Sequence, residues 1–450
     1  MQSNLLLPPI SGRTKLSLLA LLALGLFAGP ASAQEPDTDL DRRRSPIVEV
    51  VERARPAVVS IDCSVGKEFS IFSTSSSGTG VVLYEDGILV TNYHVVFPED
   101  RPANRITIRF DQSDDATLYR GEVISFEKSE DLALVKIEGA GPFPTVEMSD
   151  DAPLLGETVV AIGNAIGRSH TVSSGIISGL HRNLEIPERG LNFRELLQTD
   201  AAINLGNSGG PLLNIVGELV GINTAVTRNA ENVGYAIPVS RVQSVLKGKL
   251  LDTSRSRAYL GMVVDEATQT VRQILSGGPA AQAGLQTGDR ITAIDGKSVG
   301  DVDSYNLQRV AISTDARVQL DFERGGKNRT AELTTWDAVQ GTIHRSLGVT
   351  LEPVWLGRSR DQFLWITSVD ENGPAGRIGL QPKDVITAIR PNTWRRGRRF
   401  EDRVDLAMLL VRLAPETTLE VEVLRDDNQD GQLERNGDMS ELYRGLLRMR

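Results

Sequence analysis

Cysteine is almost absent from this sequence, since Cys63 is the only one among 450 residues. A single cysteine excludes an intramolecular disulfide and any metal site built from clustered cysteines. Its surroundings, AVVSIDCSV, are typical of a strand and favour a buried apolar side chain over a reactive thiol. The stability of the folded chain must therefore come from packed cores.

Positive charge is in deficit, with 49 Lys and Arg against 59 Asp and Glu and a net charge of −10. An acidic protein is a poor ligand for the phosphate backbone, so we expect no nucleic-acid partner. Histidine is scarce as well, because the chain has only four. Any general base of the imidazole type must be one of these four.

Long apolar runs are also lacking, and the most apolar stretch, residues 16–27 (LSLLALLALGLF), is short. It follows Arg13 and Lys15 and precedes small residues that end at Ala33. A membrane-spanning helix needs about 20 apolar residues, whereas a basic start, an apolar centre and a small-residue site are typical of a secretory signal. We predict a signal peptide over residues 1–33 with cleavage near Ala33, and an exported protein that does not require membrane contact.

Helical periodicity is rare in the first half of the chain, where short β-branched runs such as TGVVLY, RITIRF, LALVKI and TVVAIG alternate with turn residues. Regularly spaced strands indicate an antiparallel barrel or sandwich. The first clear helical period lies at residues 239–251, and the polar residues 252–257 are typical of a linker. We predict a flexible leader at residues 34–47 and a β-rich domain at residues 48–251.

The second half of the chain contains an internal repeat. The stretch GGPAAQAGLQTGDRITAI at residues 277–294 returns as NGPAGRIGLQPKDVITAI at residues 372–389, a shift of 372 − 277 = 95 residues. YLGM, near the start of the first copy, returns as SLGV. The repeat predicts two copies of one small domain, at residues 258–336 and 342–450.

A glycine-rich stretch around Ser208, DAAINLGNSGGPL, is the strongest chemical signal. Glycines permit a sharp turn and let a substrate approach main-chain N–H groups, as an acyl-transfer nucleophile requires. The same composition occurs in ordinary loops. Ser208 therefore needs partners elsewhere in the chain before a catalytic role follows.

Two residues upstream of Ser208 are candidates for these partners. His94 ends the strand-like run ILVTNYHVV, and Asp131 stands just before LALVKI. A serine nucleophile needs a base, and the base needs a carboxylate that fixes its tautomer. The order His, Asp, Ser belongs to chymotrypsin-type enzymes. The stretch also fits the G-x-S-x-G elbow of α/β-hydrolases, but that fold requires a histidine after the serine, and His344 lies beyond the linker.

Together these motifs resemble the HtrA/Deg family of exported serine endopeptidases. The matching stretches are ARPAVVSI, SSGTGVVLYEDGILVTNYHVV, SEDLALVKI, AIGNAIG, TVSSGIISG, QTDAAINLGNSGGPL, GELVGINTAV and GYAIPVSRV. The resemblance implies a mainly β chain, with a chymotrypsin-like double antiparallel β-barrel followed by two α+β PDZ domains. It also implies an ATP-independent, periplasmic endopeptidase for unfolded or damaged exported proteins, assembled as a homotrimer or a multiple of trimers. The alternative is a chaperone or peptide-binding scaffold of the same architecture with little physiological proteolysis.

The same resemblance assigns roles in the site. Ser208 is the nucleophile, His94 the general base and Asp131 its orienting carboxylate. The backbone N–H groups of Gly206 and Ser208, with Asn207, form an oxyanion hole. The residues that line an apolar substrate pocket are Ala165, Ile203 and Val233.

Asn207 is uncharged and cannot form an ion pair with a newly cut N-terminus. The resemblance instead implies control by contacts that order the loops around the site. In this sequence those loops are residues 163–168, 180–192 and 227–234. A disorder-to-order switch in these loops is our hypothesis.

PDZ domains bind an extended peptide beside a glycine-containing loop that holds its carboxylate. The expected peptide-binding residues are Tyr259, Leu260, Gly261 and Met262 in the first copy and Leu347, Gly348 and Val349 in the second. No cofactor is expected. The stretch opened by Asp426 resembles a calcium loop, but Gly437 stands where a bidentate Glu is needed, so an acidic turn without metal is the interpretation that we favour.

Overall fold

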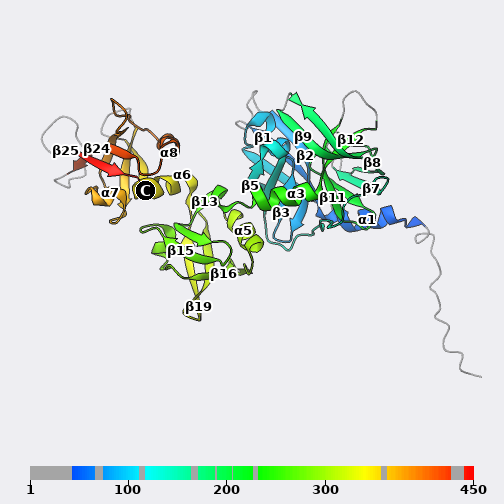
Figure 1. Ribbon diagram of the computed structural model, residues 1–450, viewed down its shortest axis with the longest axis horizontal. Coiled ribbons are helices and arrows are strands. Elements are labelled where there is room, and N and C mark those ends of the chain that lie inside the picture. The colour runs from blue at the N-terminus through cyan, green and yellow to red at the C-terminus, as the bar shows by residue number, and fades with distance from the viewer. Residues whose placement is uncertain are drawn as a thin grey trace, which may run out of the picture. The chain divides into compact units, whose positions relative to one another are not determined.

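Two closed antiparallel barrels make up the first half of the chain in the computed structural model (Figure 1). The structure describes residues 43–65, 74–110, 117–163, 171–187, 190–204, 206–226, 232–355, 362–426 and 440–449. The strands of the first barrel, in the order β1-β2-β3-β6-β5-β4, are β1 (Val58–Val65), β2 (Thr74–Tyr84), β3 (Ile88–Thr91), β4 (Arg105–Phe110), β5 (Leu118–Glu127) and β6 (Leu132–Glu138). Those of the second, in the order β10-β11-β12-β9-β8-β7, are β7 (Thr158–Gly163), β8 (Thr171–Ile186), β9 (Leu191–Thr199), β10 (Pro211–Asn214), β11 (Leu219–Val226) and β12 (Gly234–Pro238).

The first barrel closes around β-branched and leucine side chains. Ile61, Ile88 and Leu134 are fully buried in its core, and such residues fit the pleated, buried surface of a strand. Cys63 is buried too, and burial raises the pKa of its thiol to about 12. The mainly β architecture and the double barrel expected from the sequence are confirmed.

The predicted loop at residues 180–192 is largely a strand hairpin. β8 runs to Ile186 and β9 starts at Leu191, and the two are paired opposite each other at these residues. Leu191 and Phe193 are buried, so packing of the hairpin against the core extends the strands into the stretch expected to be a loop.

Among the described residues of the barrel half, the helices are few and short. They are α1 (Pro46–Ala54), α2 (Tyr93–Val96) and α3 (Val239–Val245), with the π-helical turn η7 (Leu246–Leu250) and the 3₁₀ turns η2 (Arg55–Ala57), η3 (Pro98–Asp100) and η4 (Lys128–Glu130). α1 begins two residues inside the segment predicted as a leader. Val50 and Ala54 are buried on one face of α1, so core packing stabilises this helix beyond what its sequence alone indicates.

The helix expected at residues 239–251 is not α-helical throughout, because α3 changes at Leu246 into the π-helical turn η7. The N–H of Leu251 donates to the carbonyl of Leu246 at 2.8 Å, five residues back. This wider turn leaves Leu246, Leu250 and Leu251 buried. The predicted linker then contains one 3₁₀ turn, η8 (Thr253–Arg255), which Asp252 caps by accepting from Ser254 N at 2.9 Å.

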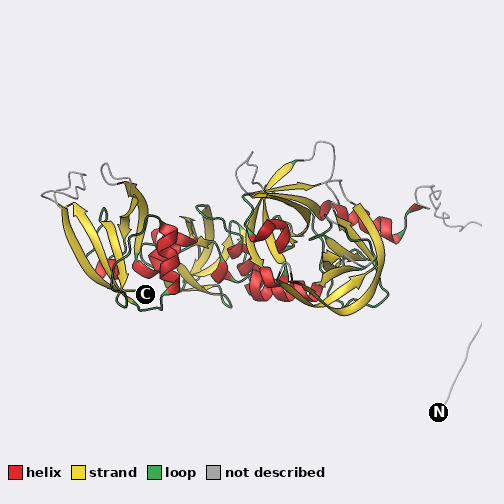
Figure 2. Ribbon diagram, turned by 90° about the horizontal axis from the view of Figure 1, so that it is seen from above, coloured by secondary structure: helices red, strands yellow, loops and turns green. Residues whose placement is uncertain are grey.

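The two repeats form separate sheets, each with its own apolar core. Strands outweigh helices in both (Figure 2). The elements of the first copy are β13 (Ala258–Tyr259), β14 (Met262–Asp265), β15 (Thr270–Ile274), α4 (Pro279–Gln282), β16 (Arg290–Ile294), β17 (Lys297–Ser298), α5 (Val302–Val310), β18 (Arg317–Arg324), β19 (Lys327–Thr334) and β20 (Trp336–Asp337). Those of the second are α6 (Ala338–Leu347), β21 (Val349–Trp355), β22 (Gln362–Val369), α7 (Pro374–Arg377), β23 (Val385–Pro391), α8 (Arg403–Arg412), β24 (Thr418–Asp426) and β25 (Ser440–Arg448).

A buried carboxylate occupies the same place in both repeats. Asp289 accepts from Gln286 N at 2.8 Å and from Arg324 at 2.6 and 2.7 Å. Asp384 accepts from Gln381 N at 2.8 Å and from Arg425 at 2.8 and 2.7 Å. Both aspartates are about 1% exposed, so the repeat read from the sequence is also a repeat of structure.

Candidate active site

His94 and Asp131 are in direct contact. His94 Nδ1 lies 3.0 Å from Asp131 Oδ1 and 2.9 Å from Oδ2. Because an ionised carboxylate only accepts hydrogen bonds, Nδ1 carries the proton and Nε2 is left as the acceptor. This is the tautomer that a general base needs, with Nε2 free to take a proton.

The sequence context of His94 predicted the end of a strand. In the structure His94 lies on the one-turn helix α2 instead. β3 ends at Thr91, and Asn92 is extended before the turn begins. The N–H groups at the start of a helix lack partners inside it. Here Asp131 satisfies two of them, because its carbonyl accepts from Tyr93 N at 3.1 Å and its Oδ1 from His94 N at 3.1 Å.

Asp131 is fully buried, and further groups fix it in place. Thr224 Oγ1, on β11 of the second barrel, donates to its Oδ2 at 2.7 Å. Asn92 Nδ2 donates to its carbonyl oxygen at 3.0 Å. Its backbone is in the left-handed region, with φ 53° and ψ 40°, directly after the turn η4.

The Ser208 turn rests on strands of the first barrel that lie close to His94. Thr79 N donates to Ser208 O at 2.9 Å, and Thr79 Oγ1 donates to Gly206 O at 2.6 Å. At Gly209 (φ 83°), a Cβ would overlap the carbonyl of Thr79 and the hydroxyl of Thr91. Only glycine permits both this backbone conformation and this approach.

The groups proposed for an oxyanion hole lie on the same turn. Gly206 has φ 102°, and Gly206 and Asn207 are buried while Ser208 is half-buried. Within the part of the chain that the structure describes, neither Gly206 N nor Ser208 N donates to another residue. Among the same residues, no hydrogen bond joins the Ser208 hydroxyl to the His94 ring. Such bonds are often long without substrate.

A cavity of about 400 Å³ adjoins His94. Tyr93, Phe97 and Leu191 contribute apolar side chains to its wall, and Asp131 also lines it. The site therefore opens to a hollow large enough for part of a polypeptide chain.

Two of the three residues predicted for a substrate pocket can be placed. Ile203 is buried, and a Cβ on Gly234 would meet its Cγ1 at 2.5 Å. Val233, half-buried, immediately precedes Gly234. Ala165 lies outside the described residues, as do most of the predicted regulatory loops at residues 163–168 and 227–234.

Comparison with known proteins agrees with this architecture. The family model of the trypsin-like peptidase domain matches residues 78–222, and that of the PDZ domain matches residues 258–335. A probable periplasmic serine endoprotease DegP-like from Pseudomonas putida is 31% identical over 365 residues, covering 73% of each chain. The chain belongs to the HtrA/DegP family of serine endoproteases. It is a serine endopeptidase with a PDZ domain.

Two further proteins show a similar degree of sequence identity. The periplasmic serine endoprotease DegP of Escherichia coli K12 is 29% identical over 441 residues, covering 83% of this chain and 91% of its own. The crystal structure of the serine endoprotease from Yersinia pestis is 29% identical and covers 65% of this chain and 98% of its own, with a TM-score of 0.38.

The predicted peptide-binding residues of this HtrA/DegP-family chain differ in how exposed their side chains are. Met262 is half-buried on β14, whereas the other side chains, of Tyr259, Leu260, Leu347 and Val349, are buried. Gly261 and Gly348 precede β14 and β21 with φ of 72° and 76°. A cavity of about 530 Å³ is lined by side chains of β14 and α5, together with residues of η8 and α6.

Among the described residues, no group of three or more His, Cys, Asp or Glu is arranged to hold a metal ion. No helix in the same part of the chain is long and apolar enough to span a bilayer. The proposed signal peptide and most of the acidic stretch that follows Asp426 lie outside the described residues.

Sequence reasoning missed Thr224 and Thr79. Each is a small hydroxyl residue in a strand pattern, GINTAV or SSGTGVV, where threonine is common for its β-propensity alone. Their partners are 93 and 127 residues away. No local signal marks such contacts.

Proposed function

We propose that the chain cleaves polypeptides with Ser208 as nucleophile, His94 as general base and Asp131 as the carboxylate that orients His94. The observation that carries this proposal is the double contact of Asp131 with His94, through Nδ1 and through the backbone N–H. A carboxylate held in this way fixes the ring and stabilises the imidazolium formed during the reaction.

The reaction follows from these positions. Ser208 Oγ attacks the scissile carbonyl carbon, and its proton passes to His94 Nε2. His94 returns this proton to the leaving amine as the C–N bond breaks, which leaves an ester on Ser208. Water then attacks the ester by the same proton path and releases the acid.

The N–H groups of Gly206 and Ser208, on the turn that includes Asn207, act as the oxyanion hole. Their lack of partners among the described residues supports this role, as does the hydrogen bond that holds Gly206 O on Thr79. Donors fixed before the reaction need no reorganisation when charge develops on the oxygen.

The substrates are unfolded or damaged exported proteins, degraded without ATP. Ile203 and Val233, with Ala165, favour small aliphatic residues on the acyl side of the scissile bond. Periplasmic relatives support export, with removal of the signal peptide near Ala33. The active form is a homotrimer or a multiple of trimers.

The PDZ domains bind peptide C-termini for recruitment or regulation. In the first copy, the loop Tyr259-Leu260-Gly261 and Met262 receive the peptide, and the cavity beside β14 and α5 supports this assignment. In the second copy the corresponding residues are Leu347, Gly348 and Val349. Added strands with a held carboxylate are the usual mode of such domains.

Degradation of an unfolded protein by the wild type and by Ser208→Ala tests this proposal. We expect the variant to bind the unfolded protein and to leave it intact. Wild-type turnover by Ser208→Ala would refute the assignment of the nucleophile. Binding without cleavage by the wild type would instead favour the chaperone or scaffold alternative.

A further inference from the structure

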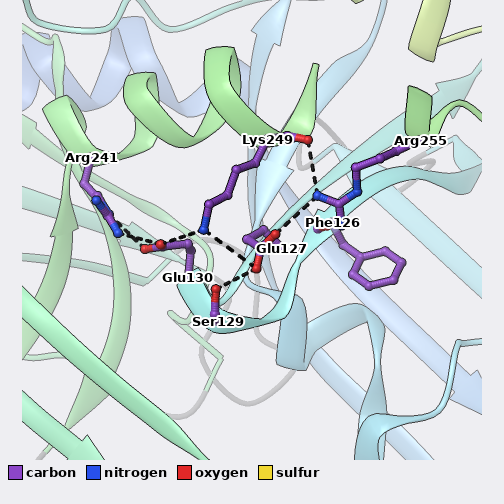
Figure 3. A network of polar contacts seen from close by, with 7 residues as sticks. All are labelled: Phe126, Glu127, Ser129, Glu130, Arg241, Lys249 and Arg255. Atoms are coloured by element: carbon purple, nitrogen blue, oxygen red, sulfur yellow. Dashed lines mark hydrogen bonds and ion pairs between the residues drawn. The ribbon is translucent and has the colours of Figure 1, made fainter. Parts of the chain in front are cut away.

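The turn η4, which directly precedes Asp131, is flanked or ended by two carboxylates, Glu127 and Glu130. Both form ion pairs with basic side chains of α3 and η7 (Figure 3). Glu130 accepts hydrogen bonds from Arg241 Nε at 2.8 Å and from Nη2 at 2.5 Å. Lys249 Nζ donates to Glu130 at 3.1 Å and lies 3.9 Å from Glu127. Glu130, next to Asp131 in the chain, therefore accepts three charged hydrogen bonds.

The two cations come from elements with buried anchors. Arg241 is on α3 and Lys249 on η7, and the apolar side chains of these elements that face the core are 0–2% exposed: Val239, Val242, Val245, Leu246 and Leu250. Such an anchor moves little, because close-packed interiors resist displacement. The cluster therefore ties the Glu130 turn to a rigid part of the protein.

Glu130 differs from the carboxylate of an ordinary surface ion pair, which contributes little to the stability of a protein. Its side chain is only 13% exposed, and Arg241 contacts it through two nitrogens, the stronger, directional form of the interaction. Burial alone would raise the pKa of Glu130, but the hydrogen bonds from Arg241 and Lys249 outweigh burial and hold the pKa below its ordinary value. Glu130 is thus ionised and paired at neutral pH.

The residue that follows Glu130 is under backbone strain. Asp131 has φ 53° and ψ 40°, a region unfavourable to residues with a Cβ. Strained conformations of this kind persist only where the surroundings impose them. The N–H of Asp131 donates to Lys128 O at 3.1 Å, which closes the turn, and the Glu130 side chain anchors the peptide bond between residues 130 and 131.

We propose that Glu130 is a positioning residue for the reaction. Held by Arg241 and Lys249, it keeps Asp131 in the left-handed conformation from which the carboxylate reaches His94. This inference rests on the proposed roles of His94 and Asp131. Glu130 touches no reacting atom, so its loss lowers turnover through a misplaced Asp131 and leaves peptide binding unchanged.

The test compares Glu130→Ala, Glu130→Gln and Arg241→Ala in the full chain. Active sites are first titrated with a fluorophosphonate, and kcat and KM are then measured per titrated site on a chromogenic peptide. Glu130→Gln retains a hydrogen-bond acceptor for Arg241 and Lys249. This variant can therefore still be measured if Glu130→Ala fails to fold. The matched control is Glu138→Ala, on β6 downstream of Asp131, which breaks the exposed ion pair with Arg120 (3.5 Å).

We expect kcat per site to fall about tenfold in Glu130→Ala and about threefold in Glu130→Gln, since small misplacements of reacting groups are costly. KM should stay within about twofold, and the control should match the wild type. Adding Arg241→Ala to Glu130→Ala should lower kcat no further, because both changes break one interaction.

Wild-type kcat per titrated site in both Glu130 variants would overturn the proposal, even if fewer molecules were active, because Glu130 would then act on folding alone. A wild-type chain that neither reacts with the fluorophosphonate at Ser208 nor turns over peptide would overturn the proposed function instead. In that case the positioning role falls with it.

Discussion

Thr224 and Asp131 join the two barrels at the candidate active site through a hydrogen bond of 2.7 Å. Thr224 belongs to β11 of the second barrel, and Asp131 leads into β6 of the first. The same carboxylate holds His94. One buried carboxylate therefore contacts both barrels and the histidine ring, and we expect Thr224 to act as a positioning residue.

Replacing Thr224 by valine should lower kcat about tenfold with little change in KM. Valine has nearly the same shape, but it leaves Asp131 Oδ2 without this donor, and a buried acceptor that loses its partner costs about 1–3 kcal/mol. Steady-state kinetics on a chromogenic peptide measures kcat and KM separately. Thr224→Ser, which keeps the hydroxyl, is the control. Equal kcat for valine and wild type would contradict a positioning role for Thr224, because the other contacts of Asp131 would then suffice to place it.

Thr79 offers a second test, because its hydroxyl holds the carbonyl of Gly206 at 2.6 Å. This carbonyl belongs to the peptide between Gly206 and Asn207, which connects the two proposed oxyanion donors. Without the bond this peptide is less firmly held, and the N–H groups of Gly206 and Ser208 on either side of it lose their alignment toward the oxyanion. Thr79→Val should lower kcat by about 10²-fold, comparable to the loss of one oxyanion donor. Thr79→Ser should retain most activity. If valine and serine variants turned over peptide equally fast, the hydroxyl would have no part in ordering this turn.

Gly209→Ala should abolish activity and destabilise the protein. The added Cβ would overlap backbone and side-chain atoms of Thr79 and Thr91, and alanine is disfavoured at φ 83°. Gly156→Ala is the control for strain alone, because Gly156 has φ 86° but open space around a Cβ. That control should lose about 1 kcal/mol and keep its activity. Thermal unfolding and peptide hydrolysis measure both effects, and an active Gly209→Ala would contradict the packing described.

Asp289 should make the first PDZ copy sensitive to acid. Burial raises the pKa of Asp289, but hydrogen bonds from Arg324 and Gln286 N outweigh burial, and the pKa lies below the ordinary 3.8. A carboxylate whose pKa is lower in the folded state contributes stability above its unfolded pKa and loses it as the pH falls through the folded value. Stability should therefore decline below pH 3.8.

Asp289→Asn should lower the free energy of unfolding of this copy at neutral pH, because Arg324 and the N–H of Gln286 lose their charged acceptor. Calorimetry of the full chain, compared with Asp384→Asn in the second copy, assigns the affected transition. The difference between Asp289→Asn and wild type should shrink as the pH drops below 3.8. A constant difference down to pH 2 would mean that the ion pair is not the origin of the stability.

Local patterns in the sequence predict the strands of both barrels, the repeat and the order of His94, Asp131 and Ser208. Each depends on residues close together in the chain, where periodicity and glycine placement act directly. The helical turn that carries His94 could not be predicted, because its first N–H groups are satisfied by Asp131, 37 residues away. The same holds for Thr224, whose partner is 93 residues distant. Such contacts exist only once the barrels have packed.

The identity of the nucleophile is measured most directly by covalent labelling. The native protein is treated with a fluorophosphonate, digested and mapped by mass spectrometry, with denatured protein and Asp131→Asn as controls. Labelling of native wild type at Ser208 alone, with loss in the denatured sample and slow labelling of Asp131→Asn, is the predicted result. Modification of another residue, or none at Ser208, would contradict the assignment of this site.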